Sequence, residues 1–304
     1  YAAVDGAVDA LKEVKVPDQV TSTKHRIAAV PEDAPDFVKN VLGTIIGNRG
    51  DELPVSALPA DGTWPVGTSA WERRDLSQVI PVWEPDLCIQ CGNCSLVCPH
   101  GVIRSKLFPA EHLQQAPASF KSAPIKGKDY PQGWHIAYQV APDDCTGCTL
   151  CVDACPVREI DEDGEEVRAL KMVERLPVLE AQRANLDWFE KLPYNKRSEI
   201  DFSNVRGVQF LRPLFEFSGA CAGCGETPYL KLATQLFGGR MMVANATGCS
   251  SIYGGNLPTT PYAVDANGRG PAWNNSLFED TAEFSLGFRL AIDQTRERAV
   301  RLLK

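Results

Sequence analysis

The feature that most constrains this chain is a cysteine pattern that occurs twice. Each copy reads Pro-Asp-x-Cys-x2-Cys-x2-Cys-x3-Cys-Pro, and the copies begin at Pro85 and Pro142. A duplicated pattern of this length indicates two equivalent structural units. We expect each unit to be a strand that leads into a cysteine loop and then a short helix, as in a pseudo-symmetric ferredoxin-like module. The β-prone residues before the two loops are Val79, Ile80 and Val82 in the first copy, and Ile136, Tyr138 and Val140 in the second.

The spacing of these cysteines suits 4Fe–4S clusters. Thiolates at i, i+3 and i+6 can surround one cubane and hold three of its irons, and in two-cluster ferredoxins of this kind the fourth Cys ligates the other cluster. A proline after each fourth Cys has no N–H and a fixed φ, so the chain turns away from the sulfur. We therefore expect cluster 1 at Cys88, Cys91, Cys94 and Cys155, and cluster 2 at Cys145, Cys148, Cys151 and Cys98.

Zinc and disulfides fit this pattern less well. Zinc ribbons use two separated pairs of ligands, so a third Cys at i+6 in both copies is one too many. Disulfides within such short loops are strained. The total of 11 Cys is odd, and secreted disulfide scaffolds are shorter and evenly paired. The pattern favours a reducing cytoplasm with thiolates committed to metal.

Composition limits the other possibilities. The 304 residues are enough for two or three domains, and 44% hydrophobic with 23% charged residues indicates folded cores. The net charge of −8 disfavours nucleic acid or anionic lipid as a partner. No apolar run approaches the ~18 residues of a membrane helix, and no signal-peptide pattern is present. The chain starts at Tyr1, and a helical spacing runs into Lys304 without a stop signal, so we expect a fragment.

The chain divides into five parts by composition. Residues 1–30 carry an apolar helical face and are expected to be the tail of an α/β domain. Residues 31–81 are rich in Pro and Gly, with a short helix at 36–46; residues 82–160 form the ferredoxin-like domain with two clusters. Residues 161–204 are a charged connector, helical from 161 to 191. Residues 205–304 alternate apolar segments with glycine turns, as an α/β domain does. The predicted apolar face is Val4, Val8, Leu11 and Val14; Trp188 and Phe189 are expected to dock the connector; Phe284, Phe288, Ala291, Ile292, Thr295, Ala299 and Leu302 give the last helical spacing.

A third set of cysteines consists of Cys221, Cys224 and Cys249. Structural zinc, a redox C-x2-C pair and buried free thiols are each reasonable for this set alone. Two clusters in the same chain make a third cluster a stronger hypothesis. Three thiolates leave one of the four irons of a cluster without a protein ligand, so we expect the fourth cysteine ligand of the cluster to lie outside this chain.

These residues carry a resemblance that covers nearly the whole chain. The sequence resembles an internal part of pyruvate:ferredoxin (flavodoxin) oxidoreductase. By this resemblance residues 31–81 are its Glu-Lys-Arg linker domain, with Arg73 where Lys is usual, and residues 205–304 are the start of its thiamine-diphosphate domain. The matching segments are Leu53-Pro-Val-Ser-Ala57, Asp61-Gly-Thr63, Trp71-Glu-Arg-Arg74, Cys88-Ile-Gln-Cys91, Cys98-Pro-His100, Gly219-Ala-Cys-Ala-Gly-Cys-Gly-Glu-Thr-Pro-Tyr229, Ala244-Asn-Ala-Thr-Gly-Cys-Ser-Ser-Ile-Tyr-Gly-Gly-Asn-Leu-Pro258 and Gly270-Pro-Ala-Trp-Asn-Asn-Ser-Leu-Phe278.

The resemblance implies an α+β and α/β multidomain enzyme, usually a homodimer, that oxidatively decarboxylates pyruvate to acetyl-CoA and CO2. It implies thiamine diphosphate, Mg2+ and three 4Fe–4S clusters as cofactors, coenzyme A as co-substrate, and ferredoxin or flavodoxin as the electron acceptor. Carried over by position, Cys221, Cys224 and Cys249 match ligands of the third cluster, and Glu226 and Cys249 match residues that touch thiamine diphosphate. Such a cofactor supplies the carbanion stabilisation, and the protein orients it.

The sequence also departs from the family. No Gly-Asp-Gly follows Cys249, so the Mg-pyrophosphate motif is absent, as are the fourth ligand of the third cluster and the N-terminal pyruvate-binding domains. We therefore expect this chain alone to be inactive. Two other functions remain open: a stand-alone iron–sulfur electron-transfer subunit, and a fragment of a relative that passes electrons to NADP. For His100, beside Cys98, we expect an exposed polar loop residue rather than a residue that tunes a cluster.

Overall fold

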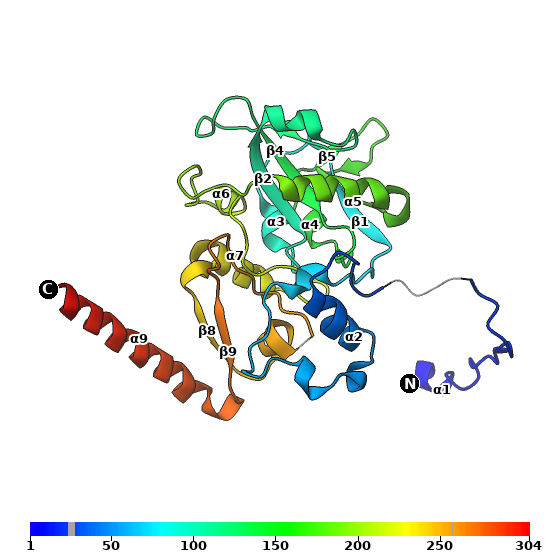
Figure 1. Ribbon diagram of the computed structural model, residues 1–304. Helices are drawn as coiled ribbons and strands as arrows, with labels where there is room; N and C mark the ends of the chain where they lie inside the picture. The colour runs from blue at the N-terminus through cyan, green and yellow to red at the C-terminus, as the bar shows by residue number, and fades with distance from the viewer. Residues whose placement is uncertain (24–27, 257) are drawn as a thin grey trace.

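The two cysteine runs fold as two equivalent units in the computed structural model, which describes residues 1–23, 28–256 and 258–304. In each unit a strand leads into the cysteine loop, a short helix follows, and a second strand closes the unit (Figure 1). The strands predicted before the two loops are confirmed. The first unit is β1 (Val79–Trp83), α3 (Asn93–Val97) and β2 (Ile103–Pro109); the second is β4 (Trp134–Val140), α4 (Leu150–Asp153) and β7 (Leu170–Glu174).

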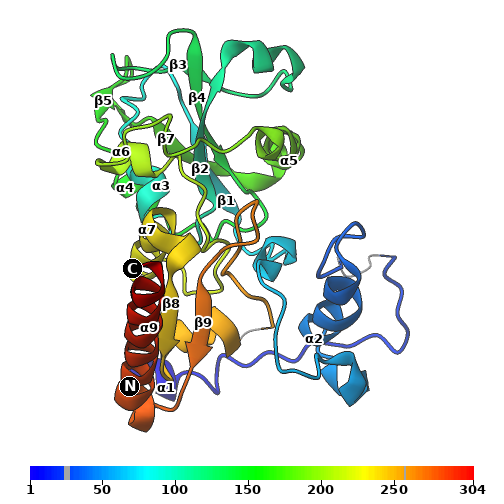
Figure 2. The same ribbon diagram turned by 60° about the vertical axis from the view of Figure 1, so that its left-hand side comes forward.

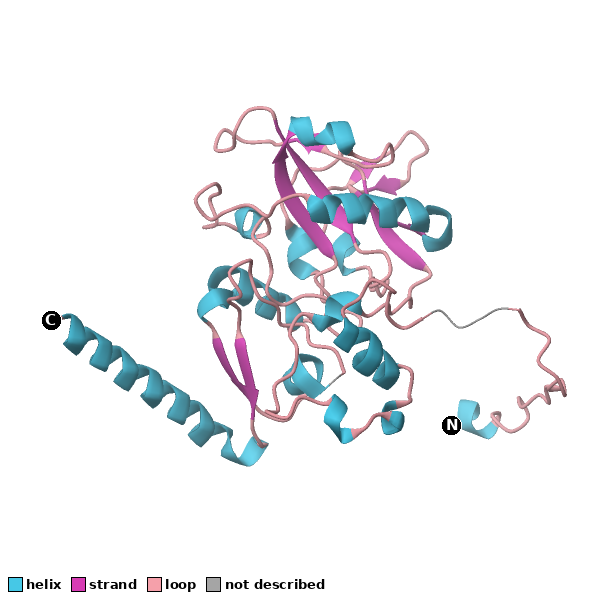
Figure 3. Ribbon diagram, viewed as in Figure 1, coloured by secondary structure: helices cyan, strands magenta, loops and turns pink. Residues whose placement is uncertain are grey.

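The two units exchange strands, so that two of the sheets each contain one main strand from either unit. The strands are the magenta arrows in Figure 3. β1 pairs antiparallel with β7, and Ile80 lies opposite Val173. β2 pairs antiparallel with β4, and Leu107 lies opposite Ile136; the short β3 (Ala123–Pro124) joins the other edge of β4. Helices α3 and α4 contact each other. This exchange brings the two cysteine loops together.

The core of this module is closed by helix α5 (Arg175–Lys191), which packs against β4. Phe108 and Phe189 are wholly buried, and the rings of Phe108 and Trp188 lie 5.9 Å apart in an edge-on contact. Burial of large aromatic side chains dominates the energetics of such a core. The predicted docking of the connector through Trp188 and Phe189 is confirmed.

The first half of the connector is not helical, and this part of the prediction is wrong. Residues 159–174 contain the β5–β6 hairpin (Glu159–Ile160 and Glu166–Val167) and strand β7, and the helix begins only at Arg175. Leu170 is buried and pairs with Trp83 of β1. Pairing with a strand far away in the sequence therefore determines the conformation of this segment more than its local composition does.

The helical face predicted near the N-terminus does not form either. Helix α1 (Ala2–Asp5) covers one turn, and Val4, Val8, Leu11 and Val14 are exposed. A helix this short is only marginally stable in water unless one face packs against a partner. Residues 24–27 lie outside the described part of the chain, and the stretch before them runs away from the body of the molecule (Figure 1).

The segment from Val30 to Trp71 forms a small hydrophobic cluster of its own. The helix predicted at 36–46 is confirmed and includes a π-helical turn, η1 (Val38–Leu42), followed by α2 (Gly43–Ile46). Its core is Ala34, Val38 and Leu42, packed against Phe37, Trp64 and Trp71. Three short 3-10 turns follow: η2 (Gly50–Glu52), η3 (Val55–Ala57) and η4 (Thr68–Trp71).

The last hundred residues contain a parallel pair of strands, β8 (Met242–Asn245) and β9 (Ala272–Asn275), with helices beside them (Figure 2). The predicted long terminal helix is confirmed as α9 (Thr281–Leu303), which contacts β8 and extends away from the rest of the molecule (Figure 1). The molecule is thus a mixed α+β structure, as predicted. No helix in the described ranges is both long and apolar enough to cross a membrane. The other elements of this part are α6 (Val205–Val208), α7 (Thr227–Phe237), η6 (Gly238–Arg240), α8 (Cys249–Ser251), η7 (Ile252–Asn256) and η8 (Phe278–Asp280). In the first unit, η5 (Ala110–Gln115) follows β2.

Candidate metal centres

The eight cysteines of the duplicated pattern line two separate cavities, four cysteines to each cavity. Three cysteines of each set come from one loop, and the fourth comes from the other unit. Such a distribution follows from the strand exchange, because Cys98 ends α3 beside the second loop and Cys155 follows α4 beside the first. The first cavity is lined by Cys88, Cys91, Cys94 and Cys155, and the second by Cys98, Cys145, Cys148 and Cys151.

Left-handed backbone conformations shape both loops at equivalent positions. The second residue after the first Cys has φ of 62° in Gln90 and 67° in Gly147; the residue after the second Cys has φ of 82° in Gly92 and 66° in Thr149. These conformations turn backbone N–H groups toward sulfur: Gln90 N–H lies 3.2 Å from Cys88 Sγ, and Gly147 N–H lies 3.4 Å from Cys145 Sγ. Hydrogen bonds to sulfur are one way in which a protein sets a cluster's potential.

Gln90 is a residue that sequence reasoning missed. A non-glycine residue in the left-handed region is strained, and its side chain offsets that cost through local hydrogen bonds. Gln90 Nε2 donates to the Pro124 carbonyl at 2.9 Å, and Gln90 Oε1 accepts from the Lys126 backbone N–H at 2.8 Å. Its position opposite Gly147 in the repeat was the only signal in the sequence.

The chemistry of the two cavities fits a sulfur-ligated cluster. Burial raises the pKa of the Cys88 thiol, although the nearby Trp83 indole and the hydrogen bond from the Gln90 N–H act in the opposite direction, and burial raises the pKa of Cys145 to about 12. A bound iron removes this cost, because the thiolate is then paired with a cation. The hydroxyl of Tyr138, which lines the first cavity, is buried and has no hydrogen-bond partner within the described residues. It is therefore free to donate to a sulfur.

No three His, Cys, Asp or Glu side chains are grouped to hold a single metal ion within the described ranges. The cysteines instead line two cavities, with four cysteines around each one. Four thiols around such a space are the donor set of a 4Fe–4S cluster.

His100 is buried, so the expectation of an exposed loop residue is wrong. It is 2% exposed and lines the second cavity. Its Nδ1 lies 2.8 Å from the Ser218 carbonyl oxygen and its Nε2 lies 3.0 Å from the Thr146 hydroxyl. Burial lowers its pKa. His100 therefore connects the cysteine loop at 145–148 to the segment that precedes Cys221.

The third set of cysteines lies at the surface of the described structure. Cys221 and Cys249 are exposed and Cys224 is half-buried. Cys224 and Glu226 directly precede α7, and Cys249 begins α8. Tyr253 brings the two segments together: burial raises its pKa, and interactions with Glu226 and Cys224 raise it further. Cys224 and Glu226 thus lie near Tyr253, which follows Cys249 by four positions.

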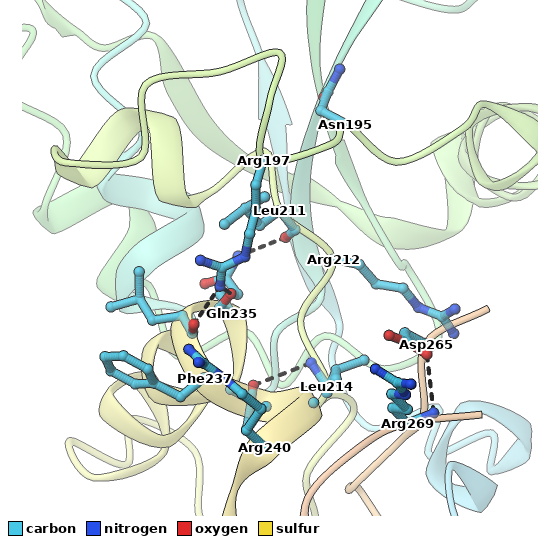
Figure 4. Close-up of a pocket in the computed structure, with 14 residues that line it drawn as sticks. Asn195, Arg197, Leu211, Arg212, Leu214, Gln235, Phe237, Arg240, Asp265 and Arg269 are labelled. Carbon is cyan, nitrogen blue, oxygen red and sulfur yellow. Dashed lines mark hydrogen bonds between the residues drawn. The ribbon is translucent and has the colours of Figure 1, made fainter. Parts of the chain in front are cut away.

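A basic pocket opens at the opposite, C-terminal end of α7 (Figure 4). Arg197 donates to the carbonyls of Gln235 and Leu236 there and so caps α7. Arg212, Arg240 and Arg269 also line the pocket. No cysteine lines it, so this pocket is separate from the metal centres.

Comparison with known proteins assigns the central module. Residues 87–158 match a 4Fe–4S dicluster domain, and residues 23–77 match a domain of unknown function termed EKR. The fold and the matched domain therefore define residues 87–158 as a module of the two-cluster iron–sulfur class.

Relatives extend the match to the whole chain. The sequence is 55% identical to a putative pyruvate-flavodoxin oxidoreductase of Synechocystis over 99% of this chain and 25% of the relative. It is 48% identical to the pyruvate:ferredoxin oxidoreductase of Moorella thermoacetica over 98% of this chain and 24% of the relative. It is 45% identical to the mitochondrial pyruvate dehydrogenase [NADP(+)] of Euglena gracilis over 96% of this chain and 15% of the relative.

The resemblance to pyruvate:ferredoxin (flavodoxin) oxidoreductase is thereby confirmed. The chain is homologous, over almost its full length, to one segment of these enzymes, and it spans about a quarter of the length of the first two of these relatives.

Proposed function

We propose that this chain is the electron-relay segment of a pyruvate:ferredoxin or pyruvate:flavodoxin oxidoreductase, working in a reducing cytoplasm. The observation that carries the proposal is the division of eight cysteines into two cavities of four, each with three from one loop and one from the other. Cluster 1 would be held by Cys88, Cys91, Cys94 and Cys155. Cluster 2 would be held by Cys145, Cys148, Cys151 and Cys98.

The contacts of the chain suggest the order of the relay. Cluster 2 would lie nearer the third set, because His100 lines its cavity and its Nδ1–H donates to the carbonyl of Ser218, three positions before Cys221. Ile89 lines the cavity of cluster 1 and is 54% exposed. A ferredoxin or flavodoxin would therefore take electrons at the surface around Ile89.

The third set would complete the catalytic end of the relay together with residues outside this chain. Cys221, Cys224 and Cys249 would hold a third cluster, and Glu226 and Cys249 would contact thiamine diphosphate bound with Mg2+. When bound, thiamine diphosphate supplies the stabilisation of the carbanion that pyruvate leaves after loss of CO2. Coenzyme A would accept the acetyl group. The proximity of Tyr253 to Glu226 and Cys224 supports one shared site.

Iron and sulfide analysis after anaerobic reconstitution tests the relay. We expect about eight iron atoms and eight sulfides from two four-iron clusters, with any third cluster raising the count. Zinc in place of iron would reject the assignment.

A chimeric enzyme tests the activity. This chain would replace the homologous segment in the Moorella pyruvate:ferredoxin oxidoreductase, with the Cys98→Ala chimera as the matched control. We expect pyruvate-dependent reduction of ferredoxin in the first chimera only. An iron-loaded chimera that oxidises no pyruvate would favour a stand-alone electron carrier.

Because the Euglena pyruvate dehydrogenase [NADP(+)] is among the similar proteins, a segment of an NADP-linked enzyme is the second candidate function. A chimera in which this chain replaces the homologous segment of the Euglena enzyme distinguishes the two candidate functions. The measurement is whether the chimera reduces NADP+ or reduces ferredoxin.

A further inference from the structure

Lys231 is a buried cation without a carboxylate partner. It lies on the second turn of α7, and its side chain is 3% exposed. Its Nζ donates to the Ser95 carbonyl oxygen of α3 and, at 2.9 Å, to Gln209 Oε1. In the described part of the chain no Asp or Glu forms an ion pair with it. Buried charges in proteins are normally paired, so this arrangement requires a negative charge from another source.

Lys106 is a buried lysine of the same molecule that has a carboxylate and an aromatic ring beside it. Its side chain is completely buried, and its Nζ donates to the Phe189 carbonyl at 2.9 Å and the Leu192 carbonyl at 2.7 Å. The Glu190 carboxylate lies 3.9 Å from it, and the Tyr194 ring lies below it at 4.2 Å. Among the described residues, Lys231 has neither a carboxylate nor an aromatic ring in this role.

The position of Lys231 points to the source of the missing charge. Ser95, which accepts its hydrogen bond, lies directly after Cys94 and three positions before Cys98 in α3. Cys94 lines the first cavity and Cys98 lines the second. Burial lowers the pKa of Lys231 to about 8, while the thiolates of Cys98 and, less strongly, Cys94 act in the opposite direction. Both cavities are therefore within electrostatic reach of one ammonium group.

We propose that Lys231 is the counter-ion shared by the two clusters and that its charge raises both reduction potentials, that of cluster 2 more than that of cluster 1. The proposal rests on the cluster assignment of the proposed function. Reduction adds one electron to a cluster and so adds one negative charge, which a buried cation stabilises more strongly than an exposed one does. Lys231 stays protonated throughout and forms or breaks no bond.

The same contact fixes the geometry of the relay. Helix α7 begins directly after Cys224 and Glu226, and one turn further Lys231 binds the backbone of α3. Lys231 is therefore a positioning residue that ties the third set of cysteines to the helix between the two cavities.

The test compares reduction potentials in the reconstituted chain, titrated anaerobically with dithionite and followed by electron paramagnetic resonance. Lys231→Met removes the charge and keeps a side chain of similar length, whereas Lys231→Arg keeps the charge. Lys106→Met is the control for loss of an equally buried lysine. For Lys231→Met we expect at least a tenfold lower equilibrium constant for reduction of cluster 2, which is about 59 mV for one electron. Lys231→Arg and Lys106→Met are expected to stay near the wild type.

The iron content of each variant distinguishes a failure of the cluster assignment from a failure of the role proposed for Lys231. A wild-type chain that binds no iron rejects the proposed clusters themselves. Iron-loaded Lys231→Met with unchanged potentials, or with a shift that Lys106→Met reproduces, overturns the role of Lys231. If Lys231→Met loses iron, retention of iron in Lys231→Arg supports charge compensation, and loss of iron in both variants overturns it in favour of a purely structural role.

Discussion

The ring Nδ1 of His100 lies 2.8 Å from the carbonyl oxygen of Ser218, two residues that are 118 positions apart. The backbone N–H of Phe217 also donates to the His100 carbonyl at 2.7 Å, and the Ser218 hydroxyl donates to the Pro99 carbonyl at 2.9 Å. These bonds join the chain directly after Cys98 to the chain directly before Cys221. The segment that carries the third set of cysteines is thus anchored to the ferredoxin-like module.

Cys98→Ala should damage the cluster built mainly by the other cysteine loop. Cys98 lines the cavity of Cys145, Cys148 and Cys151 rather than that of its own loop. We expect iron to fall from about eight to about four atoms per chain. Alkylation followed by mass spectrometry should then label Cys145, Cys148 and Cys151 while Cys88 stays protected.

Cys155→Ala is the mirror control and should expose the cysteines of the first loop. Labelling of the first loop in Cys98→Ala would show that each loop binds its cluster independently and would reject the crossed ligation.

The sequence predicted the cysteine sets, the two strands before them and helix α9, because each depends on local spacing. The burial of His100 was not predictable, since it depends on Ser218, which is remote in the sequence. Strand β7 was missed for the same reason: it pairs with β1, and its local composition resembles that of the helix that follows. The left-handed conformation of Gln90 was missed because a glycine is the usual residue there. Non-local contacts account for most of these errors.

Gly147→Ala should destabilise the second cysteine loop. Gly147 has φ of 67°, and an added Cβ would overlap the Ser77 hydroxyl and lie 3.3 Å from the Val79 carbonyl oxygen. Ser77 is itself held, because its hydroxyl accepts from the Val79 N–H at 3.1 Å. We expect a loss of more than ~1 kcal/mol in the free energy of unfolding and reduced iron occupancy of cluster 2.

Gly133→Ala is the matched control for this change. Gly133 has a similar φ of 77° and no heavy atom within 4 Å of the added Cβ, so it carries the backbone cost without the overlap. Equal losses of stability and iron in the two variants would show that Ser77 yields and that the contact is unimportant.

Lys106 should make the stability depend on pH in the alkaline range. Burial lowers its pKa from 10.5 to about 8. Between these values the unfolded chain binds a proton that the folded chain does not, so the free energy of unfolding rises with pH. Below the folded pKa the full cost of burying the charge is present. We expect the wild type to gain stability relative to Lys106→Met as the pH rises from about 8 to about 10.5.

Thermal unfolding of the two proteins side by side measures this difference, and the cysteines that titrate in the same range cancel because both proteins contain them. A difference that stays constant across the range would show that Lys106 keeps its ordinary pKa in the folded state.

Alkylation of the cluster-loaded chain should distinguish the third set of cysteines from the other eight. Cys221 and Cys249 are exposed, whereas the eight cysteines of the two cavities are buried or half-buried. A thiol reacts as its thiolate and only where the reagent has access, and an iron-bound sulfur is not free to react. Under anaerobic conditions we therefore expect iodoacetamide to label Cys221 and Cys249 rapidly, while the other eight react only after a chelator removes the iron. Protection of Cys221 and Cys249 that the chelator abolishes would instead show that this chain assembles a third cluster without a fourth cysteine, and an iron count near twelve would accompany it.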